Sequence, residues 1–188
     1  MKPSPDSLLR LLALGVAFLA ASLALPAASS DDDVAKATLT KVGDPAPSFA
    51  GTTLGEEAIS AAQLKGKVVV LSLFATWCGP CNAELPHVEK ELWQAFRGRG
   101  LVVLAAGREE GPDKLRPFAA KLGLTFPLVP DTDRKIFQLF ATAYIPRLYV
   151  IGADGRIKFQ SVGFDETEFK AAIAAVDQEL GKSAGNQK

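Results

Sequence analysis

The sequence predicts an α/β fold in which a central mixed sheet is covered by helices on both faces. Apolar segments typical of buried strands alternate with segments of helical periodicity between residues 43 and 181. Near the end of the chain, two strand-like segments flank the pair Asp154 and Gly155. An Asp-Gly pair is a strong hairpin signal, so we expect antiparallel strands at one side of the sheet.

Each expected element follows from a local pattern. Nearly continuous β-branched and aliphatic runs predict strands that are covered on both faces, and apolar residues spaced by three or four predict helices. In chain order, the expected elements are a strand at 67–74, a helix at 78–97 kinked by Pro86, a strand at 101–107, a helix at 114–123 ended by Gly123, an extended segment at 126–131, a helical segment at 132–143, a hairpin at 147–163 and a helix from Asp165 to about 180.

The first 29 residues resemble an export segment. Lys2 and Arg10 accompany an apolar run at 11–25, which small residues and three aspartates follow. This order is typical of a signal peptide, and an N-terminal membrane anchor uses the same pattern, so both interpretations stay open. We expect residues 30–42 to be a linker, 43–181 one domain and 182–188 a flexible tail.

The charge order of the N-terminus predicts that the domain faces an extracytoplasmic compartment, the periplasm, which is oxidising. The chain has 188 residues, with 21 basic and 21 acidic side chains. Without a basic stripe, nucleic acid is not an expected partner.

The only two cysteines, Cys78 and Cys81, lie in the segment ATWCGPC. A strand followed by a helix is expected to place Cys78 at a helix N-terminus, where backbone N–H groups and the helix dipole lower the pKa of a thiol. Cys81 follows about one turn later, behind Pro80, and is suited to attack a mixed disulfide at Cys78. We therefore expect Cys78 to be the nucleophile and Cys81 the resolving thiol of a redox-active disulfide.

Other roles for the pair are less well supported. A loop this short gains little stability from a disulfide. A structural zinc site needs about four ligands, and His87 is the only histidine in the chain. The sequence therefore predicts no metal and no cofactor.

The motifs that surround the cysteines resemble the thioredoxin fold. The segments VGDPAPSF, LKGKVVVL, ATWCGPCNAELP, TFPLVPD and IPRLYVIGADG are similar, in this order, to its TlpA/ResA-like branch. That branch consists of exported or membrane-anchored thiol–disulfide oxidoreductases, several of which reduce apocytochrome c. The resemblance covers about residues 42–180 and implies a strand–helix insert at roughly 106–135.

The resemblance also implies roles for residues outside the cysteine pair. Pro146 matches a cis-proline beside the disulfide, and Ile145 before it is expected to contact the substrate backbone. Arg147 stands where the branch usually has threonine, so we expect altered charge near the groove and a preference for acidic partners. Trp77 is expected to pack over the active site, and Gly79 with Pro80 matches the loop of reducing thioredoxins.

A proton acceptor for the resolving thiol is expected at Glu84. Cytoplasmic thioredoxins carry an aspartate six residues before the first cysteine, where this chain has Ser72. The TlpA/ResA-like branch instead uses a glutamate three residues after the second cysteine, which matches Glu84. Burial would raise the pKa of this carboxyl and suit it to accept the proton of Cys81.

Together these features predict a cofactor-free reductase of disulfides in exported proteins such as apocytochrome c, re-reduced by a membrane thiol donor. Two alternatives remain open. A thiol peroxidase of peroxiredoxin type shares the fold and the opening segment, but Ala75 occupies the position of its hydroxyl residue. A copper-binding assembly factor would need a distal histidine, and none follows His87.

Overall fold

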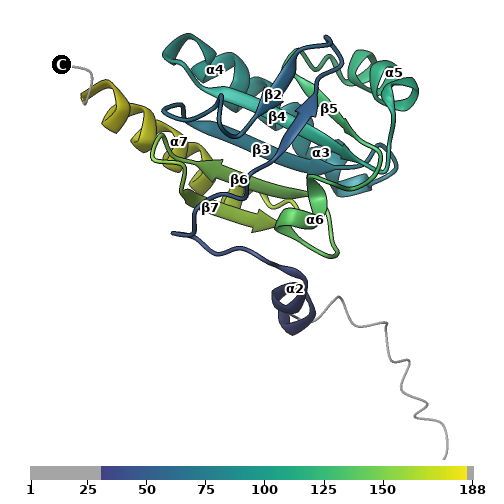
Figure 1. The fold of residues 1–188 in the computed structure, drawn as a ribbon, viewed down its shortest axis with the longest axis horizontal. Coiled ribbons are helices and arrows are strands. Elements are labelled where there is room, and N and C mark those ends of the chain that lie inside the picture. The colour runs from purple at the N-terminus through teal and green to yellow at the C-terminus, as the bar shows by residue number, and fades with distance from the viewer. Residues whose placement is uncertain (1–30, 186–188) are drawn as a thin grey trace, which may run out of the picture. The chain divides into compact units, whose positions relative to one another are not determined.

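The structure, a computed structural model, describes residues 31–185 (Figure 1). The expected export segment at 1–29 lies outside the described residues, as do the last three residues of the expected tail. No helix within 31–185 is long and apolar enough to span a membrane.

A five-stranded mixed sheet forms the centre of the domain, with the strand order β5-β4-β3-β6-β7 (Figure 1). β3 pairs in parallel with β4 and antiparallel with β6, while β5 extends the parallel half and β7 the antiparallel half. The predicted mixed α/β fold is therefore confirmed. The strands are β3 (Val69–Phe74), β4 (Val102–Arg108), β5 (Leu128–Asp131), β6 (Arg147–Ile151) and β7 (Ile157–Val162).

The side chains of β3 alternate between two apolar clusters, one on each face of the sheet. Val70 and Phe74 belong to the cluster that packs against α3, α5 and α7. Leu71 and Leu73 belong to the other cluster, together with residues of α6. Because successive side chains of a strand point to opposite faces, β3 is buried along its whole length, as its sequence predicts. The helices are α3 (Gly79–His87), α5 (Pro112–Leu122), α6 (Phe137–Phe140) and α7 (Glu166–Gly185).

The helix that follows β3 changes its winding after Pro86. α3 ends at His87, and a π-helical turn, η1 (Val88–Trp93), continues the chain before α4 (Gln94–Phe96) and the 3-10 turn η2 (Arg97–Arg99). A proline inside a helix has no N–H to donate and its ring crowds the preceding turn. The π-helical turn begins two residues after Pro86, close to the position at which the sequence predicts a kink.

Three further element boundaries match their sequence signals. Gly123 ends α5 in the left-handed conformation, with φ at 65°. Asp154 and Gly155 lie in the turn between β6 and β7, where Gly155 has φ at 76°. Asp165 accepts hydrogen bonds from two N–H groups of the first turn of α7, as the predicted cap requires.

The insert expected at 106–135 corresponds to α5 and β5. Helical structure at 132–143 is shorter than expected, because α6 spans only Phe137–Phe140. The N–H groups of Ile136 and Phe137 instead donate to the buried carboxylate of Asp131, which fixes the entry into this short helix.

The segment expected to be a linker forms contacts with the domain. Helix α2 (Asp31–Ala37) is followed by a β-bridge between Thr38 and Ala141. The hairpin of β1 (Ala50–Thr52) and β2 (Ala58–Ser60) comes next and makes a separate two-stranded sheet.

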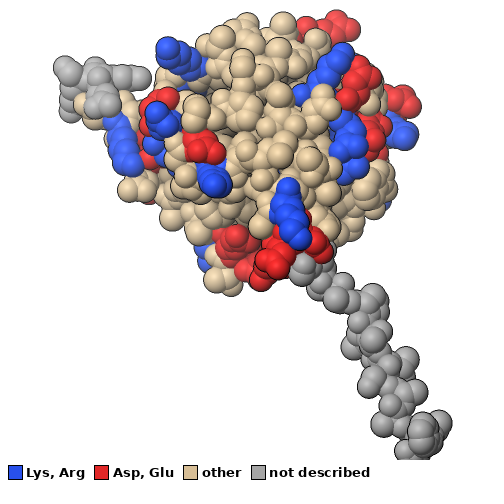
Figure 2. Space-filling model, turned by 60° about the horizontal axis from the view of Figure 1, so that its bottom comes forward, with Lys and Arg blue, Asp and Glu red and all other residues tan. Residues whose placement is uncertain are grey.

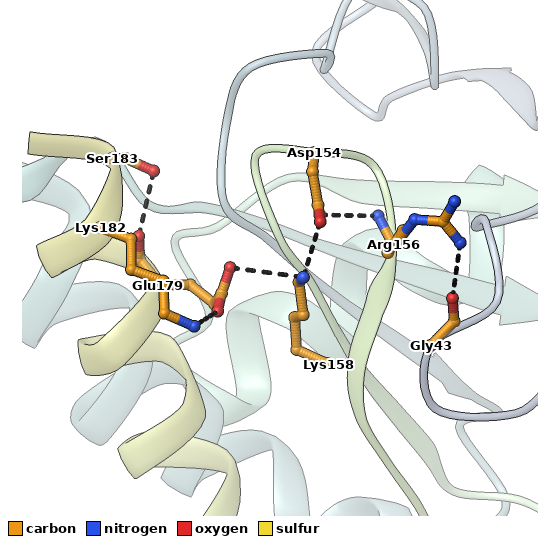
Figure 3. Close-up of polar contacts among 7 residues, drawn as sticks. All are labelled: Gly43, Asp154, Arg156, Lys158, Glu179, Lys182 and Ser183. Atoms are coloured by element: carbon orange, nitrogen blue, oxygen red, sulfur yellow. Dashed lines mark hydrogen bonds and ion pairs between the residues drawn. The ribbon is translucent and has the colours of Figure 1, made fainter. Parts of the chain in front are cut away.

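Charged side chains connect the end of α7 to the hairpin at the edge of the sheet (Figure 3). The carboxylate of Glu179 forms an ion pair with Lys182 and lies 3.9 Å from Lys158 Nζ. The same Nζ forms an ion pair with the carboxylate of Asp154. On the face drawn in Figure 2, basic and acidic side chains are interspersed around a broad uncharged area.

Candidate active site

The two cysteines lie where β3 passes into α3, and they form a disulfide. Cys78 is the N-cap residue of α3, and its Sγ accepts a hydrogen bond from the backbone N–H of Cys81 at 3.2 Å. Cys78 is 5% exposed and Cys81 is fully buried. The structure thus gives Cys78 the helix N-terminus and Cys81 the inner position, as expected from the sequence.

The exposed part of the site surrounds Cys78. Gly79 and Pro80 form the exposed first turn of α3, where a proline costs no intrahelical hydrogen bond. Trp77 is 67% exposed, so its ring lies on the surface next to Cys78 and is not part of the core.

The loop before β6 approaches the disulfide from a distant part of the chain. The peptide bond between Ile145 and Pro146 is cis, and the carbonyl oxygen of Ile145 lies 3.8 Å from Cys78 Sγ. Pro146 is buried and Ile145 partly exposed. The two residues singled out for a substrate groove therefore lie beside Cys78.

Glu84 is buried on the inner side of the site. Its side chain is 1% exposed, and Ser72 Oγ donates a hydrogen bond to its Oε2 at 3.1 Å. Burial raises the pKa of the Glu84 carboxyl to about 8, although the hydrogen bond from Ser72 opposes the rise. Glu84 and Cys81 are three residues apart on one helix and hence neighbours on its surface.

Arg147 does not alter the charge of the groove, so that expectation was wrong. The residue is fully buried and is paired in register with Leu73, whose side chain faces away from α3. Directly opposite residues of an antiparallel pair share one face of the sheet. The guanidinium instead donates to the carbonyl oxygens of Ala143 and Tyr144 and to Thr38 Oγ1.

The sequence did not indicate Glu110, a buried carboxylate next to the cysteine loop. It is 2% exposed and accepts hydrogen bonds from the backbone N–H of Thr76 at 2.7 Å and from its Oγ1 at 2.5 Å. Glu110 follows β4, the parallel neighbour of β3, so the loops after both strands meet at one edge of the sheet. This adjacency comes from the pairing of the strands, and no local sequence signal indicated Glu110.

His87 contacts aromatic and acidic side chains. Its Nδ1 lies 2.6 Å from Glu91 Oε1, and its ring packs against Phe164 and Phe169. Within residues 31–185, no three side chains of the metal-binding types are grouped so as to hold an ion.

Comparison with known proteins agrees with this site. Residues 42–160 match the model of the AhpC/TSA family. The chain belongs to the AhpC/TSA family. It is 32% identical over 123 residues to the thiol–disulfide oxidoreductase ResA of Bacillus thuringiensis, covering 65% of this chain and 70% of that protein.

Solved structures that are similar to this chain have the same fold. The thiol:disulfide interchange protein of Chlorobium tepidum, of the thioredoxin family, is 27% identical and covers 75% of this chain and 99% of its own, with a TM-score of 0.62. A secreted disulfide oxidoreductase of Mycobacterium tuberculosis is 25% identical over 68% of this chain and 95% of its own, with a TM-score of 0.58. With its disulfide at the end of β3, the protein is a thioredoxin-fold thiol–disulfide oxidoreductase of the ResA type.

Proposed function

We propose that the protein is an extracytoplasmic reductase of disulfides in exported proteins, with the CxxC segments of apocytochrome c as its substrate class. The buried carboxyl of Glu84 is the observation that carries the proposal. Its pKa of about 8 is close to the pKa of about 8.5 of an ordinary thiol. The raised pKa of Glu84 makes its carboxylate a stronger base than that of an ordinary glutamate and lowers the free-energy cost of moving a proton to it from Cys81.

The first step of the proposed reaction takes place at Cys78. Its thiolate, stabilised at the N-terminus of α3, attacks one sulfur of the substrate disulfide. A mixed disulfide forms, the substrate disulfide breaks, and the second substrate sulfur leaves as a thiolate that takes up a proton from water.

The second step releases the substrate. Glu84 in its carboxylate form accepts the proton of the Cys81 thiol, and the resulting thiolate attacks Cys78 Sγ. The bond between Cys78 and the substrate breaks, and the substrate departs as a dithiol. The protein has lost two electrons and carries the Cys78–Cys81 disulfide, the form that the structure contains.

Another dithiol must then reduce the protein again. In an oxidising compartment such electrons have to come through the membrane, so a membrane thiol donor is part of the proposal. The apolar segment at 11–25 supports export of the domain or its retention at the membrane surface.

Trapping in cells tests this function. A Cys81→Ala variant lacks the resolving thiol, so it should accumulate as mixed disulfides through Cys78 with proteins outside the cytoplasm. Mass spectrometry of these adducts should identify proteins with CxxC segments, cytochrome c apoproteins among them. The matched control is the Cys78→Ala, Cys81→Ala double variant, and equal yields from both variants would overturn the proposal.

Two further measurements distinguish the proposed function from the thiol peroxidase and the copper-binding factor that the sequence left open. A thiol peroxidase would retain rapid peroxide consumption after Cys81→Ala, because its chemistry needs one cysteine. A copper-binding factor would bind one equivalent of Cu(I) in the reduced form. We expect slow peroxide consumption and no stoichiometric copper binding.

A further inference from the structure

Thr76, two residues before Cys78, is fixed by hydrogen bonds to two neighbouring elements. Its N–H and its hydroxyl both donate to the carboxylate of Glu110, which comes from the loop after β4. Its carbonyl oxygen accepts a hydrogen bond from Asn82 Nδ2 of α3 at 3.3 Å. Every polar group of Thr76 is thus engaged at the point where β3 turns into α3.

The loop that carries Glu110 is itself firmly placed. The backbone N–H of Glu109 donates to the carbonyl oxygen of Asp131 at 2.9 Å, and Glu109 has a positive φ of 59°. At Gly107, a β-carbon would lie 2.6 Å from the side chain of Leu115, so only glycine lets α5 pack this closely on β4. The carboxylate of Glu110 therefore projects from a rigid support.

The placement of Cys78 depends on this anchor. Thr76 and Trp77 are the two residues that separate Cys78 from the last core position, Ala75. If Thr76 shifts, Cys78 moves relative to the N–H groups of α3 and to the carbonyl of Ile145. Small displacements of a reacting group reduce rates strongly.

We propose that Glu110 is a positioning residue for thiol–disulfide exchange, because its carboxylate fixes Thr76 and so holds Cys78 at the N-terminus of α3 opposite the cis-proline loop. The inference rests on the thiol–disulfide activity of the cysteine pair and is independent of the physiological substrate. Glu110 acts only through Thr76 and exchanges no proton with the substrate.

The test uses the purified, reduced protein and an aromatic disulfide that releases a coloured thiol. Cys78 attacks the reagent and displaces one coloured thiolate, and Cys81 then displaces the second and closes the disulfide. Glu110→Ala removes both hydrogen bonds to Thr76 and should slow the first release about tenfold or more. Glu110→Gln keeps an acceptor for the N–H of Thr76 and should restore most of the rate.

A second measurement separates positioning from a purely structural role. In the Cys81→Ala background, the rate of alkylation by iodoacetamide against pH reports the pKa of the Cys78 thiol. Glu110→Ala should move this profile to higher pH, because the sulfur loses its alignment with the helix N-terminus. The control is Glu109→Ala, whose side chain is about half exposed and pairs with Arg108 and Arg134 at the surface; it should change neither the profile nor the rate.

The outcomes are distinct. A Glu110→Ala variant with lowered thermal stability but an unchanged rate and alkylation profile would overturn the proposal. If Glu110→Ala does not fold, Thr76→Val, which keeps the backbone N–H and removes the hydroxyl, should show a smaller shift in the same direction; an unchanged profile there would also overturn it. Because the reagent is synthetic, failure to trap cytochrome c apoproteins in cells would leave this result standing.

Discussion

Two buried glutamates flank the same dithiol loop, and their surroundings differ. Glu84 lies under the loop on α3 and receives one hydrogen bond, from the hydroxyl of Ser72. Glu110 lies beside the loop and receives two, from the N–H and the hydroxyl of Thr76. A carboxylate with few donors takes up a proton more readily, whereas one with several donors is suited to hold a backbone segment in place. The first arrangement suits the proton transfer that we propose for Glu84, and the second suits the positioning role that we propose for Glu110.

The largest effect that distinguishes the two glutamates is expected from Glu84→Gln. This variant should lack the pH dependence of the unfolding free energy that Glu84 causes. The pKa of Glu84 is about 8 in the folded protein and 4.5 as its reference value. The folded state binds the proton of Glu84 more tightly than the unfolded state does. The contribution of Glu84 to the free energy of unfolding is therefore fully present below about pH 4.5 and is lost as pH rises through about 8. At about 1.4 kcal/mol per pKa unit, the loss amounts to several kcal/mol.

Denaturant unfolding of the oxidised protein between pH 5 and 9 measures this effect. The difference in unfolding free energy between Glu84→Gln and the unmodified protein should change steadily from pH 5 to about 8 and level off above it. Two parallel curves would show that the pKa of Glu84 is not raised, and its carboxylate would then be too weak a base for the proposed role as proton acceptor.

A smaller effect is expected from Ser72→Ala. Without the hydroxyl, the carboxylate of Glu84 loses its hydrogen bond while its neutral form loses less, so the pKa of Glu84 should rise above about 8. Resolution of a mixed disulfide by Cys81 should then reach its maximum at higher pH. NMR titration of the Glu84 carboxyl carbon measures the shift, and a lowered pKa would contradict the assignment of Ser72 as donor.

The smallest effect is expected far from the disulfide, at an exposed carboxylate. A hydrogen bond from Lys158 lowers the pKa of Asp154, so the stability from this pair is present above about pH 4 and is lost as pH falls below it. Asp154→Asn should cost less than about 1 kcal/mol at neutral pH, and the cost should diminish in high salt. A loss as large as that at Glu84 would mean that burial does not explain the difference between the carboxylates.

Much of the fold and the centre of the site could be predicted because they depend on local signals. The strand before Cys78, the helix after it, the Asp-Gly hairpin and the cap at Asp165 each follow from a few adjacent residues. Glu84 was identified through the resemblance to the TlpA/ResA-like branch, and one helical turn connects it to Cys81. Its burial and the donor Ser72 depend on how β3 and α3 pack.

The remainder required tertiary information. Arg147 was assigned to the groove because it follows Pro146, although its register opposite Leu73 turns it to the other face of the sheet. β6 is buried along its whole length and carries apolar residues on both faces, so its sequence has no polar–apolar alternation that would have revealed this. Glu110 is 34 residues from Thr76, and only the parallel pairing of β3 with β4 brings their loops together.

The buried hydrogen bonds of Arg147 also determine which end of the domain is suitable for attaching a label. Arg147 and Thr142 hold the end of α2 beside the cis-proline loop, so a reporter joined before Asp31 starts within about 10 Å of that loop, the length of a seven-residue helix. The last turns of α7 instead line a pocket together with the residues that precede β3. A reporter placed after α7 is separated from the disulfide by the length of that strand, about 20 Å, and leaves the substrate face free.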